Sequence, residues 1–251
     1  MLALEVSERV AWLRLDRPEK RNALPGSLWP RLRATLAELG EDDAVAAVVL
    51  HGAGPSFCVG ADLADFGADN DLGARRRLLR EAIAALRELE ELPKPTLAAV
   101  HGHCVGGGLE MTLVCDLVVA DATASFAAPE ARVGLVPGVL LARGPGRIAE
   151  HWLRYLALTG EPLDAETARL AGLVNFTVPT GEHLAKAEEL ATGLAQRAPL
   201  SHAVTKAALA GGGSGRLEDA VETGAMLQAS EDFAEGVAAF RAKRPPEFRA
   251  R

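Results

Sequence analysis

The stretch TLAAVHGHCVGGGLEMTLV, residues 96–114, runs from an apolar segment through a group of glycines into a second apolar segment. Thr96 to Val100 is short and almost wholly apolar, which is typical of a strand buried on both faces of a sheet. Gly106 to Gly108 follow, and the residues up to about Val114 have the composition of a short helix. Because parallel strands need helical crossovers between them, a buried strand that leads into a helix indicates an α/β fold.

The chain on both sides of this stretch continues the alternation of strands and helices up to about residue 178. Apolar residues at alternating or continuous spacing predict the strands, and leucines at helical spacing predict the helices. The expected strands lie within residues 1–15 (two strands around a polar turn at 7–9), at 46–50, at 96–100 and at 117–120. The expected helices before residue 178 cover residues 27–39, 72–92 and 106–114.

From Gly181 onward the periodic segments are all helical. Four helices are expected, near residues 181–197, 199–210, 215–229 and 230–242. The glycine-rich segment 211–215 predicts a flexible break among them, and residues 244–251 are expected to form a loose tail. We therefore divide the chain near residue 195, into an α/β core of residues 1–195 and a C-terminal helical region of residues 196–251.

Composition excludes several classes of protein. The chain has 251 residues, 49% of them hydrophobic, and 27 Lys and Arg against 34 Asp and Glu, for a net charge of −7. An acidic chain without a block of like charge offers no electrostatic reason to bind nucleic acid or an anionic membrane. No apolar run is long enough to span a bilayer. We therefore expect neither nucleic acid nor membrane among its partners.

The spacing of the cysteines and histidines argues against a metal site and against a disulfide framework. Cys58, Cys104 and Cys115 are an odd set without a CxxC pair, which favours a reducing, cytoplasmic location. His101 and His103 lie close together, but no third ligand is near them in sequence. We expect no bound metal.

The glycines invite a nucleotide-binding interpretation that their spacing does not support. No GxGxxG can be drawn through residues 101–108, and GxxxxGK[ST] is absent. A GxSxG nucleophile turn and an HExxH zinc motif are absent as well. Dinucleotide enzymes, phosphate-loop enzymes and serine hydrolases therefore lack their sequence signatures here.

Donation from the backbone is a better use of these glycines. The first N–H groups of a helix have no partner within it, and glycine lets a ligand approach them closely. If the helix begins at about Gly106, the N–H of Gly107 is a free donor, and Glu110 lies one turn further on the same face. The alternative is close packing of strand against helix, with Glu110 as a charge that complements the helix dipole.

Two further positions fit the same chemistry. Residues 57–63, FCVGADL, leave a buried stretch through Gly60, and the N–H of Ala61 is a candidate second donor. Two donors aimed at one oxygen form an oxyanion hole. A second carboxylate, Glu130, follows Pro129, a residue typical of a helix start. Taken alone, Glu130 is equally explained as a charge at that helix start.

The ordered set of motifs resembles the enoyl-CoA hydratase/isomerase superfamily, which has the crotonase fold. The resemblance runs along nearly the whole chain. It is carried by DRPEKRNAL (16–24), FCVGADL (57–63), AAVHGHCVGGGLE (98–110), CDL (115–117), PE (129–130), VPG (136–138), LTG (158–160) and EDFAEGVAAFRAKRPPEF (231–248). It implies an α/β spiral core of repeated ββα turns and a C-terminal helical region that forms trimers or dimers of trimers. It also implies acyl-CoA thioester substrates, with no cofactor apart from the coenzyme A of the substrate.

The resemblance assigns roles to individual residues. It places the oxyanion-hole donors at Ala61 and Gly107, and the catalytic glutamates at Glu110 and Glu130. Positions expected to contact substrate are Lys20, Arg21, Ala23, Gly60, Asp62, Leu63, Gly106, Pro129, Leu135, Gly138, Phe240 and Lys243. Among these, the N–H of Gly138 is expected to help place a catalytic water. Phe240 and Lys243 are expected to close the pocket, in some members across a subunit boundary.

Two segments depart from the family pattern. His101-Gly102-His103 stands where Asn-Gly-Tyr is frequent, and residues 139–141 replace a second pair of glycines. Both departures concern the acyl side of the pocket, so they leave the acyl preference open. Because both glutamates are present, hydration of a 2-enoyl-CoA is the expected reaction. Double-bond isomerisation, other acyl-CoA chemistry on this fold and non-catalytic acyl-CoA binding are the alternatives.

Overall fold

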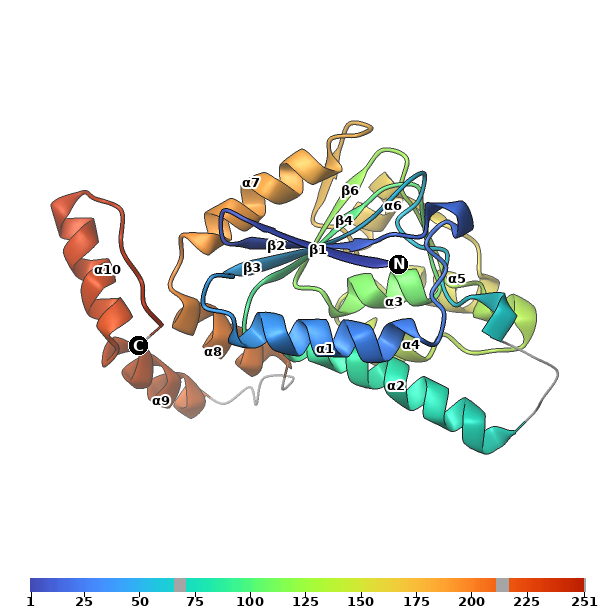
Figure 1. Cartoon of the computed structure of the whole chain (residues 1–251), viewed down its shortest axis with the longest axis horizontal. Helices are drawn as coiled ribbons and strands as arrows, with labels where there is room; N and C mark the ends of the chain where they lie inside the picture. Colours follow the sequence, from blue (N-terminus) through green and yellow to red (C-terminus); the bar gives the residue numbers. More distant parts are fainter. Residues whose placement is uncertain (66–70, 211–216, 251) are drawn as a thin grey trace.

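Strands from the first 178 residues build a six-stranded sheet at the centre of the molecule (Figure 1). The computed structural model describes residues 1–65, 71–210 and 217–250. The strands, in their order across the sheet, are β1 (Leu2–Ser7), β2 (Val10–Leu15), β3 (Ala47–Gly52), β4 (Thr96–Val100), β6 (Leu117–Asp121) and β9 (Phe176–Val178). β1 pairs antiparallel with β2, and the remaining neighbours are parallel. The α/β class predicted from the sequence is confirmed.

A second sheet of three short strands lies beside the first. It consists of β5 (His103–Val105), β7 (Ser125–Ala127) and β8 (Leu163–Asp164), in that order. An isolated bridge between Cys58 and Cys104 joins the segment before Gly60 to β5. The sequence analysis did not predict these strands, because two or three residues are too few to show a period.

Helices cover both faces of the large sheet (Figure 1). α1 (Leu28–Glu41), α2 (Leu72–Glu91) and α3 (Gly107–Val114) bury their leucines against one face, in the larger hydrophobic core. α7 (His183–Ala195) lies on the other face, where Ala187 and Ala191 meet Ala47, Val49 and Ala99. Every residue of β4 is buried, as expected for a strand with helices on both sides.

Shorter elements connect the layers. Three 3-10 helices are present, η1 (Pro18–Lys20), η2 (Leu63–Asp65) and η3 (Pro129–Val133). The short helices of the second half are α4 (Gly138–Arg143), α5 (Glu150–Thr159) and α6 (Ala165–Leu170). Within the described ranges, no helix combines the length and the apolar character needed to cross a membrane.

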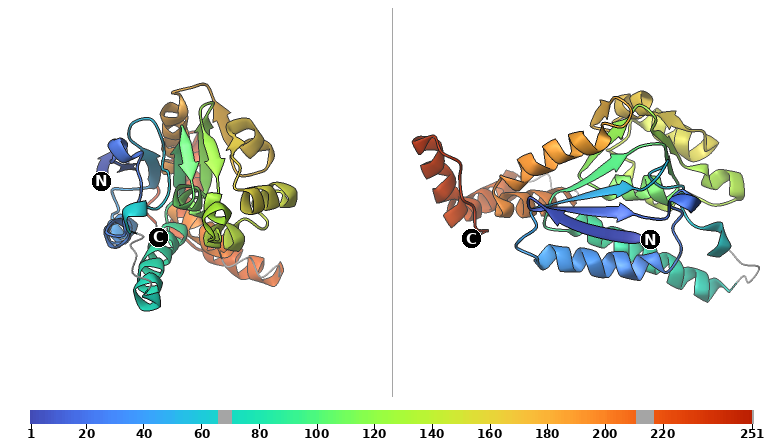
Figure 2. Two further views of the ribbon diagram at one scale, coloured as in Figure 1. Left: turned by 90° about the vertical axis from the view of Figure 1, so that its right-hand side faces the viewer. Right: turned by 45° about the horizontal axis from the view of Figure 1, so that its top comes forward.

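The chain ends in α8 (Pro199–Ala210), α9 (Leu217–Gln228) and α10 (Glu231–Ala242). α9 and α10 lie beyond α8, away from the sheet (Figures 1 and 2). A groove of about 530 Å³ runs between these three helices, and apolar side chains that include Phe233, Phe240 and Phe248 line it. The predicted glycine-rich break at 211–215 lies outside the described residues.

The expected loose tail after residue 243 is wrong. Arg244 pairs with Glu235 of α10 at 2.6 Å, and the N–H groups of Arg249 and Ala250 donate to Asp232 at 2.7 and 3.1 Å. The tail therefore folds back along α10, because two acidic side chains of that helix accept hydrogen bonds from it. A run of charge and proline in the sequence did not reveal these acceptors.

Three imidazoles gather where the carboxyl ends of neighbouring parallel strands meet. His51 is the next-to-last residue of β3, His101 follows β4, and His183 opens α7. The rings of His101 and His183 stack with centroids 4.5 Å apart, and His183 Nδ1 lies 3.3 Å from Asp121 at the end of β6. Burial lowers the pKa of His51 to about 4, with Arg14 and the other two imidazoles acting in the same direction.

This cluster predicts a loss of stability in mild acid. Between the ordinary pKa of 6.5 and about 4, the unfolded chain binds a proton at His51 that the folded chain does not. The free energy of unfolding therefore falls as the pH falls through this window, and for His51 alone by about 2 kcal/mol from pH 7 to pH 5. In His51→Phe the fall measured by denaturant unfolding is smaller, whereas the exposed His151→Gln behaves as the parent. Identical pH dependence in the parent and His51→Phe would contradict this assignment.

Candidate active site

A turn made only of glycine carries the chain from β5 into α3. Gly106 has φ 52° and ψ −117°, a conformation that residues with a side chain avoid. Its N–H donates to Ala127 of β7 at 2.9 Å, and its carbonyl accepts the first helical bond, from Glu110, at 2.9 Å. Between these two anchors, the N–H of Gly107 has no acceptor among the described residues.

The segment around Gly60 runs alongside this turn. Leu24 N–H donates to the Gly60 carbonyl at 2.8 Å, and Asp62 N–H donates to the Leu24 carbonyl at 2.9 Å. This parallel bridge uses the carbonyl of Gly60 and the N–H of Asp62, the residues on either side of Ala61. The N–H of Ala61 therefore points away from Leu24. Across residues 1–65, 71–210 and 217–250 this N–H has no acceptor either.

The two free donors are close neighbours because no side chain separates them. A methyl group on Gly60, where φ is +88°, would lie 2.9 Å from the Val105 carbonyl and 3.3 Å from the Gly107 nitrogen. A methyl group on Gly107 would lie 3.9 Å from the Ala61 nitrogen. The glycines therefore bring the two predicted backbone donors close together, and their service to one oxygen atom stays a prediction.

Both predicted glutamates reach the same turn. Glu110 projects from the first turn of α3, and its Oε1 accepts the N–H of Val139 at 3.1 Å. Glu130 lies in η3, and its Oε1 is close to Gly106, where a methyl group would be only 3.1 Å away. Glu130 Oε2 is buried and has no hydrogen-bond partner in the described part of the chain. A buried carboxylate oxygen without a partner indicates a place for water or ligand.

The environment disfavours ionisation of both carboxyl groups. Burial raises the pKa of Glu110, the charge of Glu130 raises it further, and the N–H of Val139 opposes them. Burial also raises the pKa of Glu130. Because the two carboxyl groups interact, they titrate as a pair. The pair holds one proton up to a higher pH than a carboxyl group in water does. The N–H of Val139 favours the ionised form of Glu110, and the backbone N–H of Glu130 acts in the same direction on the Glu130 carboxyl group.

A buried asparagine, Asn22, ties the segment of residues 17–24 to the loop that leads into Gly60. Asn22 Nδ2 donates to the carbonyls of Ala53, Ser56 and Phe57 at 2.8 to 3.1 Å, and its Oδ1 accepts the N–H of Arg17 at 2.9 Å. Its φ of +59° lies in the left-handed region, which asparagine tolerates. The sequence analysis included Asn22 in a motif but gave it no role, since the three carbonyls that it binds are more than 30 residues away.

The remaining predicted contact positions fall into two groups. Those in residues 20–63 lie along the segment that Asn22 anchors: Lys20, Arg21 and Leu63 are exposed, Ala23 is half-buried, and Asp62 pairs with Arg17 at 2.6 Å. Pro129 and Leu135 flank Glu130, whose carbonyl accepts the Leu135 N–H at 2.9 Å.

Three predicted positions need a further comment. Gly138 opens α4, but the N–H that reaches Glu110 belongs to the next residue, Val139, which the sequence analysis missed. Phe240, 86% exposed, and Lys243 belong to the far end of α10, and a single chain does not bring them to the glutamates (Figure 1). Their expected role in closing the pocket stays a prediction that concerns an assembly.

No cation site accompanies these groups. The described residues contain no cluster of three or more His, Cys, Asp or Glu side chains arranged to hold a metal ion. Cys58, Cys104 and Cys115 are free and buried, and burial raises the pKa of each thiol. The chemical groups at the site are therefore two backbone donors and two carboxyl groups.

Known proteins share this arrangement of the chain. The profile of a family described as "Enoyl-CoA hydratase/isomerase" matches residues 5–251. The 2,3-dehydroadipyl-CoA hydratase of Escherichia coli is 35% identical over 262 residues, which cover 100% of this chain and 99% of that protein. The mevalonyl-coenzyme A hydratase of Aspergillus fumigatus is 35% identical over 251 residues, which cover 94% of this chain and 90% of that protein.

Solved structures give the same result. The crystal structure of an enoyl-CoA hydratase from Bacillus anthracis matches with a TM-score of 0.93 at 29% identity, over 100% of this chain and 99% of that one. One from Mycobacterium smegmatis matches with a TM-score of 0.91 at 30% identity, over 98% of both chains. These likenesses confirm the crotonase fold that the sequence motifs implied.

The close approach of the two turns can be tested with Gly60→Ala. The added methyl group would meet the Val105 carbonyl at 2.9 Å and would force a residue with a side chain into a φ of +88°. We expect the two donors to separate and turnover of a 2-enoyl-CoA to fall by about a hundredfold or more, as for loss of one oxyanion donor. Gly193→Ala, on α7 with open space around it, is the control. Unchanged kcat in Gly60→Ala would show that the spacing of the two amides does not matter.

Proposed function

Because the chain belongs to the enoyl-CoA hydratase/isomerase family, we propose that it adds water to 2-enoyl-CoA thioesters and forms 3-hydroxyacyl-CoA. The observation that carries the proposal is the meeting of Ala61 N–H and Gly107 N–H with two partly buried carboxyl groups at one glycine turn. Binding of an acyl-CoA alone requires neither carboxyl group. The relatives named above are hydratases of different acyl groups, which supports hydration and leaves the acyl group open.

The two backbone donors stabilise the negative charge of the reaction. When water attacks C3 of the enoyl thioester, the electron pair of the C2–C3 double bond moves towards the thioester oxygen. The N–H groups of Ala61 and Gly107 are proposed to bind that oxygen as it becomes an enolate. Donors that are already in place need no reorganisation, and the loss of one costs about 2.7 to 4 kcal/mol.

The two glutamates are proposed to divide the proton transfers. Glu110, whose ionised form the Val139 N–H favours, takes a proton from water while the water oxygen bonds to C3. Glu130, whose pKa is raised by burial, gives its proton to C2 as the carbonyl is restored. The sum is one water added. Glu110 then holds a proton that Glu130 lacks, and exchange with solvent returns the pair to its starting state.

The substrate supplies the only non-protein group that this mechanism needs, so we propose no separate cofactor. Free, buried cysteines agree with the cytoplasmic location that we propose. The exposed Lys20 and Arg21, beside the segment that Asn22 anchors, are proposed to face the phosphates of coenzyme A. Leu63 and Leu135, both exposed and apolar, are proposed to contact the substrate beside the glutamates.

Replacement of either glutamate tests the proposal. Glu110→Gln and Glu130→Gln each remove one proton transfer while keeping the shape of the side chain, so hydration should fall by about a hundred- to ten-thousandfold. The assay follows the loss of conjugated thioester absorbance of crotonyl-CoA and the mass gain of one water. Glu150→Gln, in a surface ion pair with Arg154, is the control.

Three outcomes would reject or redirect the proposal. Full turnover in either variant refutes the paired mechanism. A parent protein that interconverts 2-enoyl-CoA and 3-enoyl-CoA without a mass change is an isomerase instead. A parent protein that binds acyl-CoA but leaves it unchanged is a binding protein.

We further propose that the protein works as a trimer or a dimer of trimers. The exposed aromatic residues Phe233 and Phe240 on α10, and the apolar groove beside them, are a surface that an isolated chain leaves in water. A partner on this surface would also explain how Phe240 and Lys243 reach a substrate pocket. The closed symmetry of most homo-oligomers agrees with this arrangement.

Light scattering tests the assembly. We expect the mass of three or six chains, and Phe240→Asp, which places a charge on the apolar surface, should shift the population towards smaller species. Phe176→Asp, a change at a partly exposed aromatic residue of the sheet edge, is the comparison. A stable single chain at micromolar concentration would contradict the proposal.

A further inference from the structure

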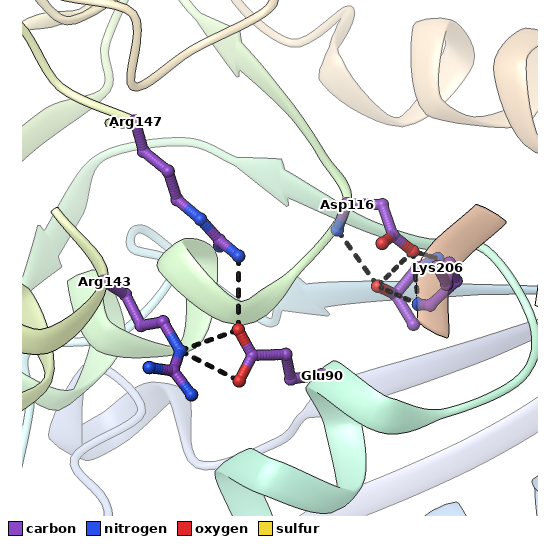
Figure 3. A network of polar contacts seen from close by, with 6 residues as sticks. Glu90, Asp116, Arg143, Arg147 and Lys206 are labelled. Atoms are coloured by element: carbon purple, nitrogen blue, oxygen red, sulfur yellow. Dashed lines mark hydrogen bonds and ion pairs between the residues drawn. The ribbon is translucent and has the colours of Figure 1, made fainter. Parts of the chain in front are cut away.

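A buried carboxylate that the proposed reaction does not use lies beside α4. Glu90, in the last turn of α2, is only 9% exposed. Its two oxygens accept from Arg143 Nε at 2.8 and 3.0 Å, and Oε1 also accepts from Arg147 Nη2 at 3.2 Å (Figure 3). Removal of a partner from a buried charge strongly destabilises the fold, so the folded protein keeps Glu90 in contact with its arginines.

The helix that Arg143 ends is the helix that touches Glu110. α4 runs from Gly138 to Arg143, and the N–H of Val139 in its first turn donates to Glu110 at 3.1 Å. Residues four apart lie on the same face of a helix, so Val139 and Arg143 are on one side of α4. Glu90 contacts one end of α4 through the Arg143 side chain, and Glu110 contacts the other end through the Val139 N–H.

A helix this short needs such an anchor. Six residues are too few for a helix to be stable by itself, and its orientation depends on tertiary contacts. The buried side chains of Val139 and Leu140 pack α4 against the core. Apolar packing is non-directional, whereas the direction of a single N–H depends on the tilt of the helix. The contact of Arg143 with both oxygens of Glu90 supplies that direction.

We propose that Glu90 and Arg143 are positioning residues that hold α4 so that the N–H of Val139 stays on the Glu110 carboxylate. Neither residue touches the substrate. Their effect passes through one helix to the group that takes a proton from water. The inference rests on the proposed role of Glu110 as the base.

The groups around Glu110 determine in which direction its pKa moves when the N–H of Val139 is lost. Burial and the Glu130 carboxylate from η3 both raise the pKa of Glu110, and the N–H from α4 lowers it. On α2, the Glu90 charge is matched by Arg143 and Arg147. If α4 tilts and the Val139 N–H no longer reaches Glu110, burial and the Glu130 charge still raise the pKa of Glu110. Glu110 then ionises at higher pH, and the acid limb of the rate profile moves to higher pH.

The kinetic test uses Glu90→Gln and Arg143→Met, with Arg143→Lys as the conservative variant. Misplacement of a catalytic group by a remote change costs up to about a hundredfold. For hydration of crotonyl-CoA we therefore expect kcat to fall about tenfold or more with little change in KM. The acid limb of kcat/KM should move to higher pH in Glu90→Gln and Arg143→Met, and less in Arg143→Lys. Arg143 is half-exposed and its loss leaves Glu90 paired with Arg147, so Arg143→Met is expected to fold.

The second ion pair of Figure 3 supplies the control. Lys206 of α8, 9% exposed, donates to Asp116, whose side chain is 33% exposed, at 2.5 Å, and this pair does not contact α4. Lys206→Met should lower the free energy of unfolding, because it removes the partner of a partly buried carboxylate, but leave the acid limb in place. An acid limb that is unmoved in Glu90→Gln and Arg143→Met, or equally moved in Lys206→Met, overturns the proposal.

Hydrogen exchange separates this proposal from the proposed reaction. Amides of residues 138–143 should exchange faster in Glu90→Gln and Arg143→Met than in the parent, and at the parental rate in Lys206→Met. This readout does not require turnover. A parent protein that does not hydrate any enoyl-CoA would refute the proposed function, whereas unchanged exchange across α4 would refute the anchoring role of Glu90.

Discussion

The site depends on one contact between two turns of bare backbone. Gly60 and the Gly106–Gly107 turn lie against each other with no room for a methyl group between them. The neighbouring bonds of each turn are complete, and the Ala61 and Gly107 amides are left over. Because no acceptor among the described residues uses these two N–H groups, both are available to one incoming oxygen atom. A similar close approach, of Gly108 to the Cys58 carbonyl, packs the start of α3 against the same segment.

Each carboxyl group reaches this contact from a different layer, and each is held differently. Glu110 stands on α3 and receives an N–H from α4, whereas Glu130 stands on η3 after the small sheet and keeps one oxygen without a partner. Burial shifts both pKa values upward, while the Val139 N–H opposes this shift at Glu110 and the backbone N–H of Glu130 opposes it at Glu130. In the proposed mechanism, the orientation of α4 decides whether the Val139 N–H reaches the base, Glu110. Through this orientation, we propose, the Glu90 ion pair affects proton transfer at Glu110, although Glu90 does not touch the substrate.

Long periodic segments were predictable and short ones were not. The helix of residues 72–91 and the buried strand of residues 96–100 have enough residues to show their period, and the structure has them at nearly the expected bounds. The three-residue strands β5 and β7 show none, although they place Gly106 and Glu130 side by side. Asn22 and Glu90 were overlooked for a related reason. The carbonyls that Asn22 binds and the arginines that Glu90 binds lie more than 30 residues away, and no local pattern connects them.

By itself, the sequence determined the α/β class, the positions of the glycine turns, and which carboxyl groups and amides are available for chemistry. These follow from local properties: the period of apolar residues, the absence of a side chain in glycine, and the unpaired N–H groups at a helix start. Only the tertiary structure decided that the N–H of Val139 reaches Glu110, that Arg143 of α4 pairs with Glu90, and that residues 244–250 pack on α10. These features are hydrogen bonds between elements distant along the chain, and their direction exists only after the core has packed.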